Sequence, residues 1–404
     1  MTGSSGEVAE QHVYWQRNLW VCTLGSFTTL IAMTLLLPFL PLYLHSLGVE
    51  EEASIAHWSA VAYGATFLTA ALTAPLWGRL ADKYGRKLML IRASLGMAVA
   101  MSLMGMATAP WQLVALRLLA GLLGGYASGS MILVASQTPK EKTGWAVGIL
   151  SSGVMAGNIA GPLVGGVLPG WMGIRATFLL TGAIIFITFL ATLFLLKEQR
   201  QPPKKATASA VEETPAAIPL PVKIMWVSGM LLVFASMSVE PIITLYVATF
   251  TPSLQHATLL AGIVMAATAL GSILAAPRIG ALADRVGHWR VLSFGLVVCG
   301  ILLIPQAFVT AVWQLVVLRF CMGLALGGML PCITAIIRHH AGANNTGRLL
   351  GYSTSAQYIG QVTGPLFGGL VAGKLGTPAV FIGTALVMLV AGALNISWRL
   401  KNQS

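Results

Sequence analysis

One carboxylate stands apart from the others in this sequence. The chain has twelve Asp and Glu residues, and only Glu240 falls well inside a long apolar segment. A carboxyl group in apolar surroundings can bind and release a proton near neutral pH as its access to water changes. The adjacent Pro241 also frees backbone groups to which such a carboxyl can hydrogen-bond. Glu240 could therefore carry a coupled proton, recognise a cationic substrate, or stay protonated and donate a structural hydrogen bond to the backbone.

Two arginines also lie inside apolar segments. Arg117 in WQLVALRLLAGLLGG at 111–125 is matched by Arg319 in WQLVVLRFCMGLALG at 313–327. An unpaired guanidinium at the centre of a bilayer costs about 2.5–3.5 kcal/mol on insertion scales, so it must face protein or a water-filled cavity. Each arginine either acts with Glu240 or holds backbone carbonyl groups in a structural role.

The elements that must position these groups are transmembrane helices. The chain is 56% hydrophobic and 9% charged, whereas soluble domains average about 25% charged residues. Its apolar blocks of about twenty residues match a hydrocarbon core of about 30 Å. The sequence predicts an all-α polytopic membrane protein with twelve helices, over 18–44, 54–77, 89–108, 111–134, 143–168, 173–196, 223–250, 257–279, 291–309, 312–337, 347–372 and 377–398.

The helices fall into two six-helix halves that repeat at an offset of about 202 residues. Besides the two arginine segments, GPLVGG at 161–166 matches GPLFGG at 364–369, and Pro38 to Tyr43 matches Pro241 to Tyr246. Such order predicts a duplicated unit. The predicted divisions are an N-terminal tail over 1–17, halves over 18–196 and 223–399, a flexible Pro-rich linker over 197–222, and a C-terminal tail over 400–404.

The net charge of +12 indicates an orientation and not a nucleic-acid partner. Of the 24 Lys and Arg residues, all but four lie at one face of the predicted bundle, the exceptions being Arg117, Arg319, Arg175 and Lys374. By the positive-inside rule this basic face is cytoplasmic, together with both termini. The first apolar segment is too long for a signal-peptide core and is expected to be retained.

A charged motif, GRLADKYGRK at 78–87, follows the second predicted helix and is repeated at 280–289. Its glycines suit a tight turn in a short loop, and its aspartate can cap a helix or pair with a cation. In the second copy His288 stands in place of Arg86. The alternative is that these charges only set the orientation of the helices in the membrane.

Glycines at four-residue spacing predict helix contacts in which two backbones approach closely. The fifth helix carries Gly153, Gly157, Gly161 and Gly165, with Pro162 allowing a bend, and the eleventh carries Gly360, Gly364 and Pro365. Gly121 and Gly125 follow Arg117 at one-turn spacing and predict another such contact.

On these motifs the chain resembles the major facilitator superfamily over essentially its whole length. Within it, the chain is similar to the bacterial twelve-helix drug:proton antiporters, most closely the MdtG-type multidrug efflux proteins, including LLLPFLPLYL at 35–44. The resemblance implies a multi-pass inner-membrane transporter that exports amphipathic or drug-like compounds by proton antiport, with two halves rocking about a central site. Many relatives carry a first-helix acid that this chain lacks.

The resemblance also implies residue roles. Arg117 would join Glu240 in proton coupling, the GPxxGG motif is typical of antiporters and favours export, and the charged motif would form a conformational latch with Gly78, Asp82, Gly85, Arg86, Asp284 and Arg285. Residues on helices that line the cavity in this superfamily are Met33, Phe67, Tyr126, Met155, Asn158, Met237, Tyr246, Met265, Arg319, Tyr358 and Gln361. Methionines and aromatics suit bulky amphipathic compounds, although any one such residue more often belongs to the core than contacts a ligand.

The sequence offers no sign of an enzyme. It lacks the GxxxxGK[ST] nucleotide-binding pattern, and its four cysteines and seven histidines have no metal-ligand spacing. We expect no metal or cofactor beyond the proton gradient, and a monomer whose partners are a small-molecule substrate, protons and lipid. Two rival functions are a transporter for one metabolite, such as a sugar or siderophore, and a non-transporting membrane sensor or scaffold.

Overall fold

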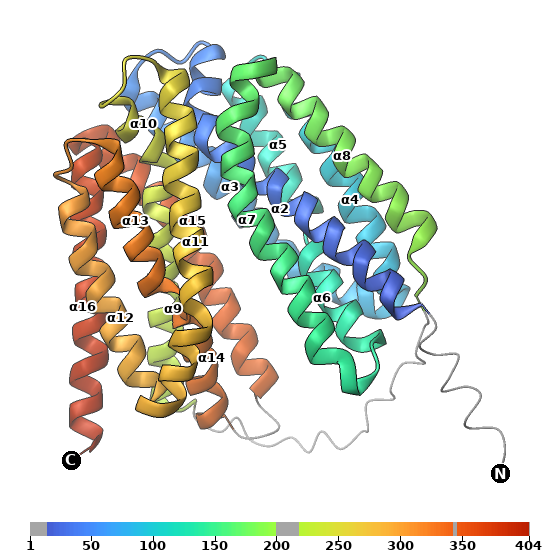
Figure 1. Ribbon diagram of the computed structural model, residues 1–404, viewed down its shortest axis with the longest axis vertical. Helices are drawn as coiled ribbons and strands as arrows, with labels where there is room; N and C mark the ends of the chain where they lie inside the picture. Colours follow the sequence, from blue (N-terminus) through green and yellow to red (C-terminus); the bar gives the residue numbers. More distant parts are fainter. Residues whose placement is uncertain (1–13, 199–217, 342–345, 404) are drawn as a thin grey trace.

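Helices account for every regular element in the part of the chain that the computed structural model describes, residues 14–198, 218–341 and 346–403. Figure 1 shows two helical bundles, with the start of α2 and the end of α16 in the lower part of the view. The first bundle holds α2 (Trp15–Ser46), α3 (Glu52–Tyr84), α4 (Arg86–Met104), α5 (Pro110–Leu123), α6 (Tyr126–Gln137), the 3-10 turn η1 (Lys140–Lys142), α7 (Thr143–Met172) and α8 (Ile174–Leu195).

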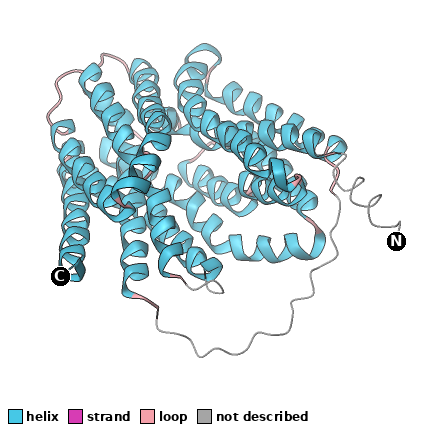
Figure 2. Cartoon of the chain, turned by 60° about the horizontal axis from the view of Figure 1, so that its bottom comes forward, coloured by secondary structure: helices cyan, strands magenta, loops and turns pink. Residues whose placement is uncertain are grey.

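The second bundle repeats this order. It holds α9 (Leu220–Val239), the 3-10 turn η2 (Glu240–Ile242), α10 (Ile243–Ala248), α11 (Leu254–Val286), α12 (His288–Gln306), α13 (Val312–Leu326), α14 (Met329–His340), α15 (Thr346–Leu375) and α16 (Thr377–Gln403). Figure 2 shows the two bundles side by side, each made of helices joined by short loops. Eleven segments in the described part of the chain are long and apolar enough to cross a membrane, and α15 is the twelfth long helix. The predicted all-α fold of two six-helix halves is confirmed.

The bounds of the second half differ slightly from the predicted ones, and most of the predicted tail and linker is not described. The described helices extend past the predicted ends of the second half, because α9 begins at Leu220 and α16 continues to Gln403. Most of the predicted tail over 1–17 and linker over 197–222, as well as Ser404, lies outside the described residues.

The fourth and tenth predicted helices are each broken at a pair of glycines. Between α5 and α6 Gly125 has a φ of 101°, and between α13 and α14 Gly328 has a φ of 100°, a region that glycine adopts without strain. Our expectation that Gly125 packs against a neighbouring helix is therefore wrong, since it ends one helix and starts another. Gly121 does pack closely, because a Cβ there would overlap the Thr66 carbonyl of α3.

The two halves meet at one end of the molecule, opposite the start of α2 and the end of α16. There a Cβ on Gly166 of α7 would lie 3.2 Å from Leu259 Cα of α11, and Thr244 Oγ1 donates to the Pro38 carbonyl across the halves at 2.8 Å. We call the other end, where α2 begins, α16 ends and most of the described Lys and Arg residues lie, the basic end. Figure 1 shows the halves diverging towards it, and a Cβ on Gly148 or Gly351 there would have no atom within 4 Å.

Candidate transport site

Glu240 lies where the helix path of the seventh span changes. Its backbone opens η2, a 3-10 turn between α9 and α10 that contains Pro241, because proline removes one backbone donor and clashes with the preceding turn. The side chain is partly buried. Among the described residues its carboxylate has neither a hydrogen bond nor an ion pair within 4 Å. It is nevertheless within electrostatic range of Arg319 and Tyr63.

Arg319 of α13 is buried, with 1% of its surface exposed. Its Nη1 contacts Met322 Sδ at 3.9 Å, while Nε and Nη2 find no hydrogen-bond acceptor in the part of the chain that the structure describes. A buried guanidinium with two unsatisfied nitrogens is costly unless an anion or water reaches it. Arg319 is thus available to Glu240, or to a bound group.

Arg117 of α5 is held more firmly. Its side chain is 2% exposed, its Nε donates to the Ala62 carbonyl of α3 at 3.3 Å, and its guanidinium lies 5.9 Å from the centre of the Tyr63 ring. Tyr63 in turn packs edge-on against Phe67, with 5.2 Å between ring centres. Arg117 therefore holds a backbone carbonyl group, as its predicted structural role requires, and also lies beside Tyr63.

Arg117, Tyr63, Glu240 and Arg319 form what we call the central cluster. Arg117 and Tyr63 come from the first half, Glu240 and Arg319 from the second, and each is electrostatically coupled to the next. The central cluster thus has members in both halves. The sequence reasoning missed Tyr63; its only signal was a position one turn before Phe67, on the same helix face.

The predicted cavity residues divide into two groups. Met33, Phe67, Asn158, Met237, Tyr358 and Gln361 are partly exposed, and Met155 is exposed. By contrast, Tyr126 and Tyr246 face the interiors of their own halves, with hydroxyls bound to Thr192 Oγ1 at 2.7 Å and to the Gln306 carbonyl at 2.8 Å. Our prediction that these two tyrosines line the cavity is corrected, because both serve as core residues with satisfied hydroxyls. Met265 is also buried, in the apolar cluster that includes Tyr63.

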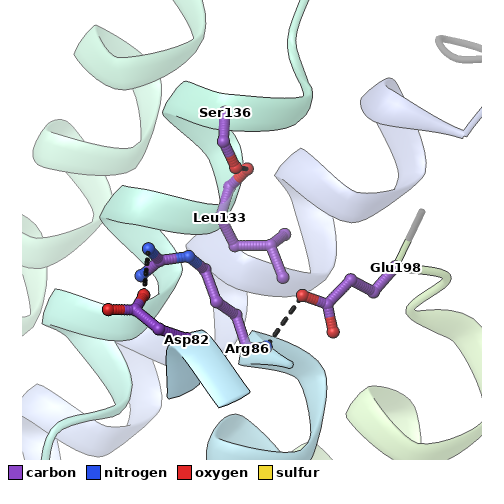
Figure 3. Close-up of polar contacts among 5 residues, drawn as sticks. All are labelled: Asp82, Arg86, Leu133, Ser136 and Glu198. Atoms are coloured by element: carbon purple, nitrogen blue, oxygen red, sulfur yellow. Dashed lines mark hydrogen bonds and ion pairs between the residues drawn. The ribbon is translucent and has the colours of Figure 1, made fainter. Parts of the chain in front are cut away.

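The charged motif at 78–87 is not a loop. α3 continues through Gly78 to Tyr84, and Gly85 alone, with a φ of 97°, joins it to α4. Asp82 caps no helix but pairs with Arg86 at 3.2 Å, as Figure 3 shows. The predicted tight turn is therefore confined to Gly85, and the predicted pairing of Asp82 with a cation is what the structure contains.

Glu198 provides the cap that was expected of Asp82. Its two carboxylate oxygens accept from the backbone N–H groups of Arg86 at 2.7 Å and Lys87 at 2.9 Å, the first residues of α4. Figure 3 shows this side chain approaching the start of α4 from the side opposite Asp82. A carboxylate suits a helix N-terminus because free N–H groups and the helix dipole both favour negative charge. The end of the sixth span is thereby fixed to the start of the third.

The glycine stripes lie at the predicted contacts. On α7, added Cβ atoms at Gly153, Gly157, Gly161 and Gly165 would meet successive residues of α2, including the carbonyls of Phe27 and Leu35. On α15, those at Gly360, Gly364 and Gly368 would meet the backbone of α9. α7 also remains helical through Pro162. Each half therefore holds its first helix against its fifth by backbone proximity.

The comparisons with known proteins agree with this architecture. The model of the Major Facilitator Superfamily matches residues 22–266 and 225–404. The chain belongs to the major facilitator superfamily. It is 41% identical over 379 residues to the multidrug resistance protein MdtG of Enterobacter lignolyticus, covering 93% of this chain and 91% of that protein, and 41% identical over 383 residues to MdtG of Serratia proteamaculans, covering 94% and 93%.

Solved structures of the superfamily share the fold. A bacterial homologue of the human lysosomal transporter Spinster, inward-facing and unoccupied, has a TM-score of 0.77 at 14% identity, covering 95% of this chain and 96% of that one. A mutant form of the nucleoside transporter NupG has a TM-score of 0.74 at 16% identity, covering 94% and 99%. This major facilitator protein is a multi-pass membrane transporter and not an enzyme.

In the second half of this transporter the motif uses different chemistry. His288 replaces Arg86 and lies 3.3 Å from Asp284, so this pair carries opposite charges only when the histidine is protonated. No acid caps α12 in the described residues there; instead Trp289 donates its Nε1–H to the Asn395 carbonyl at 3.0 Å and stacks on Trp398 with ring centres 4.3 Å apart. Arg285 has no ion pair among the described residues.

We expect the Glu198→Gln variant to weaken the tie between the sixth and third spans. A glutamine keeps the size of the side chain but has one acceptor oxygen and no charge, and losing a cap of this kind costs about 1 kcal/mol. The apparent melting temperature of the purified protein should fall. Glu141→Gln is the matched control, since Glu141 is an exposed acid at the same end that has no ion pair among the described residues. Equal melting temperatures for the two variants would show that the cap contributes nothing.

Proposed function

We propose that this protein exports amphipathic, drug-like compounds across the bacterial inner membrane in exchange for protons. The MdtG relatives are named as multidrug resistance proteins, which supports export of such compounds. The basic end then faces the cytoplasm by the positive-inside rule, and the proton gradient is the only energy source. The unit that works is one monomer in its lipid bilayer.

The observation that carries the proposal is the position of Glu240 in the central cluster. It is the acid that lies well inside an apolar segment, whereas Asp82 and Asp284 stand in the last turns of α3 and α11. Its carboxylate has no hydrogen bond among the described residues, and it lies within electrostatic range of Arg319 of its own half and Tyr63 of the other half. Unprotonated, the carboxylate attracts the Arg319 guanidinium of its own half and would be able to accept a hydrogen bond from the Tyr63 hydroxyl of the other half. Protonated, it releases them, so proton binding changes the forces that hold the halves together at their centre.

The two arginines have separate parts in this cycle. Arg117 is anchored to the Ala62 carbonyl and keeps Tyr63 within reach of Glu240. Arg319 keeps two donor nitrogens unsatisfied and is the group that Glu240 and a substrate compete for. When either Glu240 or the substrate has bound Arg319, the contacts between the halves at the end opposite the basic end would open. The latch at the basic end, formed by Asp82, Arg86 and Glu198, would then close, which gives alternating access.

Transport in proteoliposomes tests the proposal. With the purified full chain, an interior-acid pH gradient should drive accumulation of an amphipathic dye such as ethidium, and adding dye should release protons from the lumen. Equal uptake with and without the gradient would rule out antiport. Accumulation driven only by an exterior-acid gradient would identify a symporter, and movement of glucose in preference to ethidium would identify a metabolite transporter. Absence of any movement would favour the sensor or scaffold.

A further inference from the structure

A groove separates α9 from α16 near the basic end of the second half. Its volume is about 410 Å³, within the range of about 300–1,000 Å³ for pockets that hold organic ligands. Figure 1 shows α16 along the outer edge of this half, and none of the residues that line the groove belongs to the central cluster. The groove is therefore separate from the transport site.

Most of the groove is apolar. Its walls include Val227 and Leu231 of α9 and Leu394 of α16, and Val227 and Leu394 are about half exposed. Exposed aliphatic side chains at this depth of a membrane protein face hydrocarbon. From Lys223 to Leu231 the groove follows nine residues of α9, a rise of about 12 Å along the helix. This is close to the depth of one leaflet of a core about 30 Å thick.

The mouth of the groove carries one positive charge. Lys223 is the only charged residue that lines it among those described, is exposed, and has no ion pair in the described ranges. Trp398 lines the same groove and is held in place by its stack on Trp289, which is itself bound to the Asn395 carbonyl. An ammonium group with no ion pair among the described residues, an aromatic ring held by stacking and an apolar slot together match an anionic head group joined to an acyl chain.

We propose that this groove binds one anionic phospholipid of the cytoplasmic leaflet, with its phosphate on Lys223 and an acyl chain between α9 and α16. The leaflet follows from the orientation proposed above, and that leaflet is rich in anionic lipids. The absence of any carboxylate from the described lining disfavours a cationic drug. The bound lipid would stabilise the packing of α9, the helix that leads to Glu240, against α16.

Native mass spectrometry of the full chain in detergent tests the site, with phosphatidylglycerol and phosphatidylcholine of identical chains as the probes. Wild type should retain one phosphatidylglycerol with about fivefold preference, since a lysine near anionic lipid contributes about 1 kcal/mol. Lys223→Gln should remove this preference. Lys83→Gln, an exposed lysine at the basic end of the other half, should keep it.

Two further variants locate the acyl chain. Val227→Trp should fill the groove and prevent retention of either lipid, and Leu394→Trp does so from the facing helix, which covers the case that one variant fails to fold. Retention of phosphatidylglycerol by Lys223→Gln at the wild-type level, or its equal loss in Lys83→Gln, would overturn the head-group assignment. Equal retention of the two lipids by wild type would overturn anionic selectivity, and undiminished retention in a folded groove-filling variant would place the lipid elsewhere.

Discussion

Replacing Glu240 with glutamine is expected to abolish proton-coupled transport while leaving the protein folded. A glutamine has nearly the same shape but no titratable proton, so gradient-driven transport should fall by roughly tenfold or more. The fold should survive because the Glu240 carboxylate makes no hydrogen bond or ion pair within the described residues that the substitution would break. The amide should also remove the attraction for Arg319 across the cluster.

The measurement separates coupling from binding. Proton release on addition of substrate should disappear in Glu240→Gln proteoliposomes, whereas exchange of labelled substrate without a pH gradient should continue. Glu50→Gln is the matched control, because Glu50 is an exposed acid between α2 and α3, and it should behave as wild type. Unchanged proton release in Glu240→Gln would remove Glu240 from the mechanism, even if export itself were established. Loss of exchange as well as proton release would instead assign Glu240 to substrate recognition.

The sequence predicted what depends on local pattern. Hydrophobic length predicted the spans, and four-residue spacing predicted the contacts of Gly157 and Gly161, because both follow from helix geometry alone. The charges buried at the centre were also found, since Glu240, Arg117 and Arg319 are conspicuous in apolar segments.

What the sequence did not reveal depends on partners far apart in the chain. Glu198 was assigned to a flexible linker, and the N–H group that it caps lies 112 residues away. The break at Gly124 and Gly125 is supported by Arg92 Nη2, which donates to the Gly124 carbonyl from α4 at 2.9 Å, and by Trp77 Nε1, which donates to the Leu122 carbonyl at 2.8 Å. A pair of glycines permits either a close contact or a break, and only these distant donors decide between them.

A second large effect is expected from Gly165→Val. A Cβ at Gly165 would overlap the Leu35 carbonyl oxygen of α2 and lie 2.7 Å from its carbonyl carbon. These are backbone atoms, which cannot turn aside as a side chain can. Overpacking costs about 1–3 kcal/mol, and we expect the upper end of this range because α2 and α7 must separate along their length. The variant should melt at a markedly lower temperature, or fail to accumulate as folded protein.

The same helix supplies the control for Gly165→Val. Gly148→Val makes the identical change on α7, where an added Cβ has no atom within 4 Å, so its cost should be limited to helix propensity and its transport should remain close to wild type. Gly368→Val repeats the test in the second half, where the added Cβ would overlap the Ser238 carbonyl of α9. Equal melting temperatures for Gly165→Val and Gly148→Val would show that α2 and α7 are not held by backbone contact. Loss of stability at both Gly165 and Gly368, with none at Gly148, would establish that the two halves share one packing rule. Their chemistry differs at Glu240, since the equivalent position in the sequence repeat of the first half is Leu37.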